Sequence, residues 1–263
     1  AQEQRKGSAM SERPELALGF DHVEAWIFDL DNTLYPADCN VFAEIDQRMG
    51  AFIAERFNMS IEAAQRLRKT YYYQYGTTLA GLMRLHDVCP HSFLDYVHDI
   101  DLSVVAPSPE LREALTSLPG RKFIFTNGSR KHAEAITGRL GLAGCFEEIF
   151  DIHAADFIPK PDVATYESFI RAHGVAPRAA AMFDDLPQNL KPAHRLGITT
   201  VLVASGATEH PEHQALQGWR ELPEHIHHAI DALPPFLAEI GARLQDEADR
   251  SRVLPLAAQF CLT

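Results

Sequence analysis

The sequence has few cysteines, no long apolar run and fewer basic than acidic residues, and each shortage excludes a class of protein. The four cysteines among 263 residues are far apart and form no C-x-x-C pair, so we expect reduced thiols rather than a disulfide framework or a zinc site. No apolar run approaches the length of a membrane span, and the polar residues 1–13 contain no signal-peptide core. These absences predict a cytoplasmic protein that has no membrane partner.

The shortage of basic residues limits the ligands that the chain can bind. There are 24 Lys and Arg residues against 36 Asp and Glu, which gives a formal net charge of −12, and no block of like charges stands out. This balance argues against nucleic-acid binding. An anionic substrate must therefore be attracted locally, by a metal ion or by a well-placed lysine.

Two nucleotide-binding fingerprints and the zinc-protease motif are also missing. The sequence contains no G-x-x-x-x-G-K and no G-x-G-x-x-G, which excludes a P-loop and a dinucleotide fingerprint. Thirteen histidines invite a metal-binding interpretation, above all His210-x-x-His213 and His225-x-His227-His228. Neither group has the i, i+4 spacing and the Glu of a zinc protease. We therefore expect the histidines to be scattered over solvent-exposed positions.

What the chain does contain is an alternation of strands and helices. The apolar residues Ala25–Phe28 predict a strand that is buried on both faces. Further strands are predicted at 122–126, around 149, at 179–183 and at 199–203. Helices are predicted at 109–118, 129–140, 162–173 and 187–196. Such an alternation is typical of a doubly wound parallel α/β sheet, whose ligands bind beyond the carboxyl ends of the strands.

Residues 37–105, which follow the first strand, show only helical periodicity. Val41, Ile45 and Met49 recur at helical spacing, and Ser60 is a candidate N-cap. We expect four helices here, which together form an all-helical insertion. The predicted organisation is a partly disordered tail at 1–20, an α/β core at 21–36 and 106–233, the helical insertion at 37–105, and a C-terminal helix, near 235–248, with a tail at 234–263.

The first strand is followed by two carboxylates, Asp29 and Asp31. Alternate side chains of a strand share one face, so the sequence predicts that both point the same way. Two like charges at a buried strand end repel each other and are costly to desolvate unless something compensates them. A divalent cation is the simplest compensation.

The other strand ends also carry polar groups. Residues 126–129 (Thr-Asn-Gly-Ser) open a helix, whose free backbone N–H groups and dipole attract an anion. Lys160 stands between two prolines at the start of another helix, and Asp184 and Asp185 follow the strand at 179–183. Carboxylates, a lysine and a hydroxyl that converge at one edge of a sheet predict a Mg²⁺ site beside a phosphate site.

Taken together, these groups resemble the sequence motifs of the haloacid dehalogenase superfamily. The four motifs are Asp29-Leu30-Asp31-Asn32-Thr33-Leu34, Thr126-Asn127-Gly128, Lys160-Pro161 and Asp184-Asp185. The resemblance covers residues 23–203, and the helical insertion resembles the C1 cap of that superfamily. It implies a Rossmann-like α/β core with an inserted cap, and a phosphohydrolase activity.

The resemblance also implies a role for each motif residue. Asp29 would attack phosphorus and form an aspartyl phosphate, and Asp31 would protonate the leaving oxygen and later activate water, for which it needs a raised pKa. Mg²⁺ would be held by the Asp29 carboxylate, the Asp31 backbone carbonyl and Asp185, with Asp184 acting directly or through water. The phosphoryl oxygens would be held by Thr126, the Asn127 amide and Lys160, of which Thr126 and Lys160 count as catalytic.

The substrate is predicted from the insertion. Residues 71–82 (Tyr-Tyr-Tyr-Gln-Tyr-Gly-Thr-Thr-Leu-Ala-Gly-Leu) with His86, and residues 31–36 (Asp-Asn-Thr-Leu-Tyr-Pro), resemble pyrimidine 5′-nucleotidases. This resemblance implies UMP or CMP as the substrate, and a tyrosine of the insertion could stack on the base. The alternative is a sugar phosphate or another small phosphorylated metabolite, followed by a phosphomutase and a non-enzymatic phospho-acceptor switch. Asp31 argues against dehalogenation, because dehalogenases lack an Asp at this position. The sequence leaves the oligomeric state open.

Overall fold

The computed structural model describes residues 19–204 and 221–257, with side chains up to residue 250, around a parallel sheet of six strands. The strand order is β3-β2-β1-β4-β5-β6, and all neighbouring strands are parallel. The strands are β1 (Ala25–Phe28), β2 (Arg121–Phe125), β3 (Glu148–Phe150), β4 (Ala180–Asp184), β5 (Thr199–Val203) and β6 (His228–Ile230). The predicted doubly wound α/β class is therefore confirmed.

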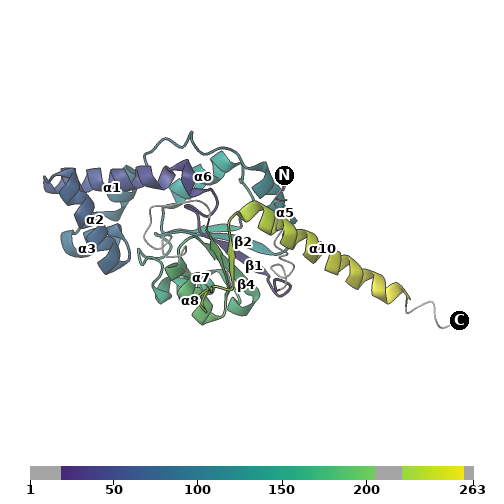
Figure 1. Cartoon of the computed structure of the whole chain (residues 1–263). Coiled ribbons are helices and arrows are strands. Elements are labelled where there is room, and N and C mark those ends of the chain that lie inside the picture. Colours follow the sequence, from purple (N-terminus) through teal and green to yellow (C-terminus); the bar gives the residue numbers. More distant parts are fainter. Residues whose placement is uncertain (1–18, 205–220, 258–263) are drawn as a thin grey trace, which may run out of the picture.

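Helices cover both faces of the sheet, because the strands alternate their side chains between two apolar clusters. In β1, Trp26 and Phe28 belong to one cluster, and Ala25 and Ile27 to the other. The first cluster is covered by α5 (Pro109–Ser117), α6 (Arg130–Leu140) and α10 (Leu233–Ala257), and the second by α7 (Val163–His173) and α8 (Pro187–Leu196). Figure 1 shows α7 and α8 on one side of the sheet and α5 and α6 on the other.

Four helices, which we call the inserted helices, lie between β1 and α5 in the chain. They are α1 (Val41–Phe57), α2 (Ile61–Tyr75), α3 (Thr78–His86) and α4 (Pro90–Val97), as predicted in number and place. The Ser60 hydroxyl accepts the backbone N–H of Ala63 at 3.3 Å, so Ser60 is the N-cap of α2 that the sequence predicts. Figure 1 shows α1, α2 and α3 together at one side of the sheet. The division of the chain into separate domains stays a prediction.

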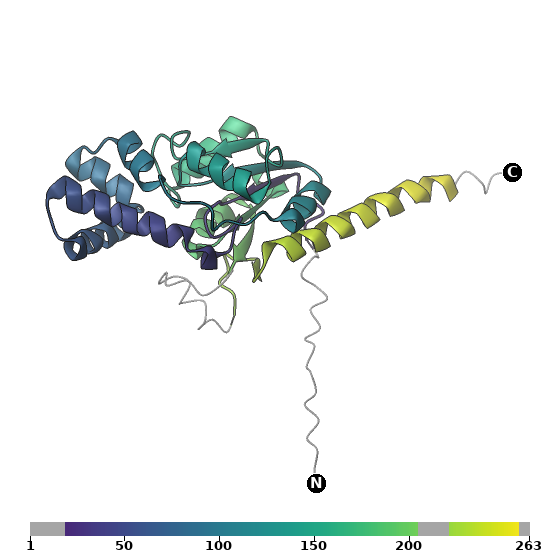
Figure 2. The ribbon, with the colours of Figure 1, turned by 90° about the horizontal axis from the view of Figure 1, so that it is seen from above.

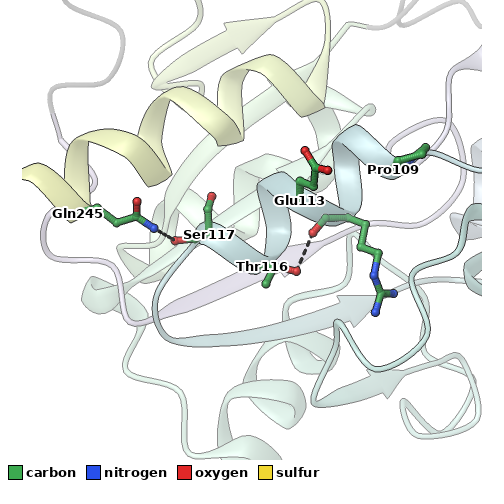
Figure 3. A pocket seen from close by; sticks show the side chains of 6 residues that line it. Pro109, Glu113, Thr116, Ser117 and Gln245 are labelled. Atoms are coloured by element: carbon green, nitrogen blue, oxygen red, sulfur yellow. Dashed lines mark hydrogen bonds between the residues drawn. The ribbon is translucent and has the colours of Figure 1, made fainter.

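Helix α10 runs along α5 and continues past it, as Figure 2 shows. The two helices approach closely at Gly241, where a Cβ would overlap the Ser117 hydroxyl. The Gln245 amide donates to the Ser117 carbonyl oxygen at 3.5 Å, beside an open pocket that Figure 3 shows. The lining of this pocket contains none of the predicted site residues.

The C-terminal region departs from prediction in two ways. Helix α10 is longer than the predicted helix at 235–248, and β6 was not predicted. The predicted tail at 1–20 lies almost wholly outside the described residues, as does the end of the C-terminal tail. Within the described part of the chain, no helix combines the length and apolar character needed to cross a bilayer.

Candidate active site

Three neighbouring strands bring the predicted site residues to one edge of the sheet. Strand β1 lies between β2 and β4, and all three run in the same direction. Asp29 follows β1, Thr126 follows β2 and Asp185 follows β4. The Asp29 N–H donates to the carbonyl oxygen of Phe183 at 2.8 Å, so the pairing with β4 fixes the backbone of Asp29.

Lys160 reaches the same edge from the loop between β3 and α7. The Asn127 side chain holds the backbone of Lys160: it accepts the Lys160 N–H at 2.8 Å and donates to the Lys160 carbonyl at 3.1 Å. The buried ammonium group donates to Oδ1 of Asp29 at 2.8 Å, to Oδ2 of Asp184 at 2.7 Å and to the carbonyl of Phe125 at 2.9 Å. Lys160 thus joins the first and fourth motifs, and the Asn127 side chain positions it.

Burial and neighbouring charges perturb both members of this ion pair. Burial raises the pKa of Asp29 well above its ordinary value, and Lys160 opposes that rise while Asp184, Asp185 and Asp31 add to it. Burial lowers the pKa of Lys160, but the carboxylates of Asp184 and Asp29 outweigh it and hold that pKa above its ordinary value. The lysine therefore stays charged, and its charge holds the pKa of Asp29 lower than burial alone would.

Three carboxylates form an acidic cluster around this lysine. Ligand oxygens of Asp29, Asp184 and Asp185 lie within 4.8 Å of one another, and all three residues are buried. With three negative charges and the one positive charge of Lys160, the formal net charge is 1 − 3 = −2. A buried excess of −2 among oxygen ligands fits a divalent cation such as Mg²⁺. Asp31 adds no side-chain oxygen to this cluster, and the sequence predicts only its backbone carbonyl as a ligand.

The Asp184 carboxylate is held by three hydrogen bonds. Its Oδ1 accepts the side-chain amide of Asn189 and the backbone N–H of Leu186, each at 2.9 Å, while Oδ2 accepts Lys160. The Tyr166 hydroxyl donates to the Asn189 carbonyl at 2.6 Å and so holds the start of α8. The loop after β4 is therefore a rigid support for the acidic cluster.

The loop after β2 forms the turn that opens α6. The hydroxyl of Thr126 accepts the backbone N–H of Gly128 at 2.9 Å, and Ser129 is the N-cap of α6. The predicted helix start is therefore confirmed. A Cβ on Gly128 would lie 3.2 Å from Oγ1 of Thr126 and 3.7 Å from Oδ2 of Asp31. The turn therefore lies close to both of these side chains.

Asp31 lies in a turn and not in the strand. Because β1 ends just before Asp29, the prediction that Asp29 and Asp31 share the face of a strand is wrong. Asn32 adopts the left-handed conformation, with a φ of 58°, which Asn tolerates better than most residues. The turn closes with the Leu34 N–H donating to the Leu30 carbonyl at 3.0 Å. This turn directs the Asp31 carboxylate toward partners of its own.

Two side chains that sequence reasoning missed contact Asp31. The hydroxyl of Tyr35 lies 2.6 Å from Oδ1 of Asp31, and Nε2 of His132 lies 2.8 Å from the same oxygen. Burial raises the pKa of Asp31, but the charge and hydrogen bond of His132 and the hydrogen bond of Tyr35 reverse this and bring the pKa below its ordinary value. The raised pKa expected for Asp31 is therefore not found.

His132 also corrects the expectation that the histidines are solvent-exposed. It is 2% exposed, and its ring stacks on that of His98 with centroids 4.3 Å apart and an interplanar angle of 9°. Nδ1 of His98 lies 3.0 Å from the hydroxyl of Ser129. The sequence signal for His132 is its place three residues after the N-cap Ser129, beside the predicted phosphate loop. The His210-x-x-His213 group lies outside the described residues.

The tyrosines of α2 point in different directions. Tyr71 is buried among the inserted helices, whereas Tyr73 is 65% exposed. The hydroxyl of Tyr72 accepts a hydrogen bond from the Gln188 amide at 2.6 Å. Gln188 lies in the first turn of α8, three residues after Asp185. This hydrogen bond joins α2 to the first turn of α8, which follows the loop that carries Asp184 and Asp185.

A comparison of the sequence with models of protein families identifies the family of this chain. The sequence model of the haloacid dehalogenase-like hydrolases matches residues 23–197. The chain belongs to this family. The matched span contains every predicted site residue, from Asp29 to Asp185.

The chain is also similar to individual proteins of different descriptions. Phosphate metabolism protein 8 of Saccharomyces cerevisiae is 29% identical over 197 residues, which cover 68% of this chain and 61% of the yeast protein. The chain thus spans about three fifths of that relative's length. A HAD phosphatase from Thermococcus onnurineus has a TM-score of 0.53 at 17% identity and covers 83% of this chain and 97% of its own. A 2-haloacid dehalogenase from Pseudomonas syringae pv. Tomato DC3000 has a TM-score of 0.53 at 19% identity, with coverages of 84% and 99%. These two likenesses establish the fold, and the chemistry must be argued from the site.

Proposed function

We propose that this haloacid dehalogenase-like hydrolase is a Mg²⁺-dependent phosphomonoesterase that cleaves pyrimidine nucleoside 5′-monophosphates, UMP or CMP, through an aspartyl phosphate on Asp29. The observation that carries the chemistry is the buried Lys160 bridge between Asp29 and Asp184. The bridge holds Oδ1 of Asp29 at 2.8 Å, and the Thr33 hydroxyl lies 3.4 Å from Oδ2. The nucleophile is therefore oriented before any substrate arrives, which is how positioning accelerates a displacement.

The residues of the site divide the reaction between them. An oxygen of Asp29 attacks phosphorus while Lys160 and Thr126 hold phosphoryl oxygens, and Asp31 gives a proton to the departing oxygen as the bond to phosphorus breaks. Asp31 then accepts a proton from the water that hydrolyses the aspartyl phosphate, and Asp29 and inorganic phosphate are released. Mg²⁺ on Asp29, Asp185 and the Asp31 carbonyl would offset the repulsion between carboxylate and phosphate.

The presence and surroundings of Asp31 favour phosphoryl transfer over dehalogenation as the reaction. A halide leaves as a stable anion and needs no proton, whereas an alkoxide leaves readily only when it is protonated. Asp31 lies next to the Thr126–Gly128 turn and is held by two hydrogen-bond donors. Such a supported carboxyl group has a use in a phosphatase and none in a dehalogenase.

The support for a nucleotide substrate comes from the inserted helices, which we propose to act as a C1 cap. The Tyr72 hydroxyl is bonded to Gln188, which lies three residues after Asp185 in the chain, and this bond is what supports a role for Tyr72 at the site. An aromatic ring at this position can stack on a base, and the Gln188 amide can hydrogen-bond its edge. A helical lid also excludes bulk water during phosphoryl transfer.

A phosphate-release screen tests both parts of the proposal. We expect turnover of UMP and CMP above that of AMP, GMP and glucose 6-phosphate, dependence on added Mg²⁺, and no chloride release from L-2-chloropropionate. Asp29→Asn should abolish phosphate release. A clear preference for glucose 6-phosphate would contradict the nucleotide assignment, and a wild type inactive on every phosphomonoester would contradict the phosphatase assignment.

Tyr72→Ala isolates the contribution of the inserted helices. It should raise KM for UMP and leave the turnover of p-nitrophenyl phosphate, which has no base to recognise, nearly unchanged. Tyr73→Ala is the matched control, because Tyr73 lies on the same helix and is 65% exposed. Equal effects of the two substitutions on KM for UMP would contradict a role for Tyr72 in recognising the base.

A further inference from the structure

We propose that Tyr35 and His132 are positioning residues that hold Oδ1 of Asp31 and thereby keep Oδ2 facing the phosphate-binding turn. This inference rests on the proposed phosphatase function and adds two residues to its machinery. Both residues touch Asp31 and neither belongs to the acidic cluster. The argument follows from the hydrogen bonds, the burial and the packing of these two side chains.

The two carboxylate oxygens of Asp31 have different surroundings. Oδ1 receives the Tyr35 hydroxyl at 2.6 Å and Nε2 of His132 at 2.8 Å. Oδ2 lies against the turn after β2, 3.7 Å from the place that a Cβ on Gly128 would occupy. Because Oδ1 already accepts two donors, Oδ2 is the oxygen left to exchange a proton with the leaving group and later with water. That oxygen adjoins the turn where the phosphoryl group is proposed to bind.

The donor role of His132 follows from the chemistry of its partner. An ionised carboxylate only accepts hydrogen bonds, so the proton of the imidazole must be on Nε2. Nδ1 of His132 is buried and, within the described part of the chain, has no hydrogen-bond partner. A buried polar atom without a partner destabilises a fold, so its retention calls for an explanation. Placement of Nε2 on Asp31 provides one.

The surroundings of His132 hold its backbone and one face of its ring. Its backbone N–H is held by the N-cap hydroxyl of Ser129 at 3.3 Å, at the first turn of α6. Its ring lies parallel to that of His98, which is itself bonded to Ser129 at 3.0 Å. His98 follows α4, so the inserted helices help to orient a residue that contacts the acid/base. His132 is therefore held in place independently of the substrate.

A comparison of substrates with different leaving groups distinguishes a misplaced acid from general damage to the fold. The value of kcat/KM reports the steps up to phosphoryl transfer to Asp29. UMP loses an alkoxide, which needs the proton of Asp31, whereas p-nitrophenyl phosphate loses a stable phenolate, which does not. The informative quantity is the ratio of kcat/KM for UMP to kcat/KM for p-nitrophenyl phosphate.

We expect Tyr35→Phe and His132→Leu each to lower this ratio by about tenfold or more, because misplacement of a catalytic group by about 1 Å can cost about a hundredfold in rate. His132→Gln keeps an amide donor at the position of Nε2 and should restore most of the ratio. Tyr166→Phe is the matched control: it removes a buried hydroxyl that bonds the Asn189 carbonyl, and it should leave the ratio unchanged.

The outcomes separate this inference from the function on which it rests. A wild type that hydrolyses neither ester overturns both. A wild type that hydrolyses both, with Tyr35→Phe and His132→Leu lowering the two kcat/KM values equally or not at all, overturns the inference and leaves the phosphatase intact. If His132→Leu fails to fold, Tyr35→Phe, which removes one hydroxyl, decides the question in the same way.

Discussion

Replacing Lys160 by methionine should lower the free energy of unfolding by about 3–5 kcal/mol, because two buried carboxylates lose their shared cationic partner. Nζ lies 2.8 Å from Oδ1 of Asp29 and 2.7 Å from Oδ2 of Asp184, and all three residues are buried. Methionine preserves most of the volume of the lysine stem. The loss therefore reports the missing charge and its hydrogen bonds, with little contribution from a cavity.

The loss should also depend on pH, with a sign that the carboxylates determine. The pKa of Asp29 is already raised by burial, and removal of Lys160 raises it further. The folded protein then binds more protons than the unfolded chain above the ordinary pKa of an Asp, about 4, so the free energy of unfolding falls as the pH rises. We expect Lys160→Met to be more destabilising at about pH 8 than at about pH 5.

Urea unfolding followed by circular dichroism, with EDTA present, measures both effects. Lys122→Met is the matched control, because Nζ of the half-buried Lys122 donates to the carbonyl oxygens of Leu118 at 2.7 Å and Gly120 at 3.1 Å. Lys122→Met should lower the free energy of unfolding by only about 1 kcal/mol. The double variant Lys160→Met/Asp184→Asn should be about 1–2 kcal/mol more stable to unfolding than the sum of the two single losses predicts. A Lys160→Met loss no larger than that of Lys122→Met, or one independent of pH, would refute the reasoning.

Two further predictions concern a histidine and the proposed metal. Burial and the neighbouring His132 lower the pKa of His98 to about 3, so the unfolded chain binds the proton first as the pH falls from 6.5, and stability should drop by up to about 1.4 kcal/mol per pH unit. His98→Asn, which cannot titrate, should show a shallower slope in urea unfolding between about pH 6.5 and pH 5, and an equal slope would contradict the assignment. Mg²⁺ at 100 times its Kd should stabilise the wild type by about 2.7 kcal/mol. Thermal unfolding with MgCl₂ or EDTA should show most of this shift lost in Asp185→Asn and kept in Asp101→Asn, an exposed control.

The sheet was predictable because its strands are short apolar runs whose direction and order follow from the alternation with helices. A parallel sheet places the carboxyl ends of its strands at one edge. The positions of Asp29, Thr126 and Asp185 relative to one another are therefore consequences of topology, which is why sequence reasoning could bring them together. Strand β6 was not predicted, although β3, which is equally short, was.

The partners of Asp31 could not be predicted in the same way. His132 contacts Asp31 because of how α6 starts after its N-cap, and His98 reaches His132 because of how α4 ends against that turn. Both contacts depend on the packing of helices that are distant in the chain. Composition alone offered thirteen histidines without distinguishing these two. The direction of the pKa shift of Asp31 was wrong for the same reason, because these unforeseen donors stabilise the ionised carboxylate.

The two aspartates of the first motif are supported by different parts of the molecule. Asp29 is held by Lys160 and the loop after β4, all within the α/β core. Asp31 is held by Tyr35 and His132, and the ring of His132 is covered by His98, which follows the last of the inserted helices. On our proposal, a shift of α4 therefore disturbs the acid/base and leaves the nucleophile in place. Phosphoryl transfer from an ester with a good leaving group then needs only the α/β core. Transfer from a nucleotide, whose leaving group needs the acid, also needs His98 at the end of α4 in contact with His132. The separation is possible because Asp31 lies in the turn that follows β1 and its side chain is not part of the acidic cluster.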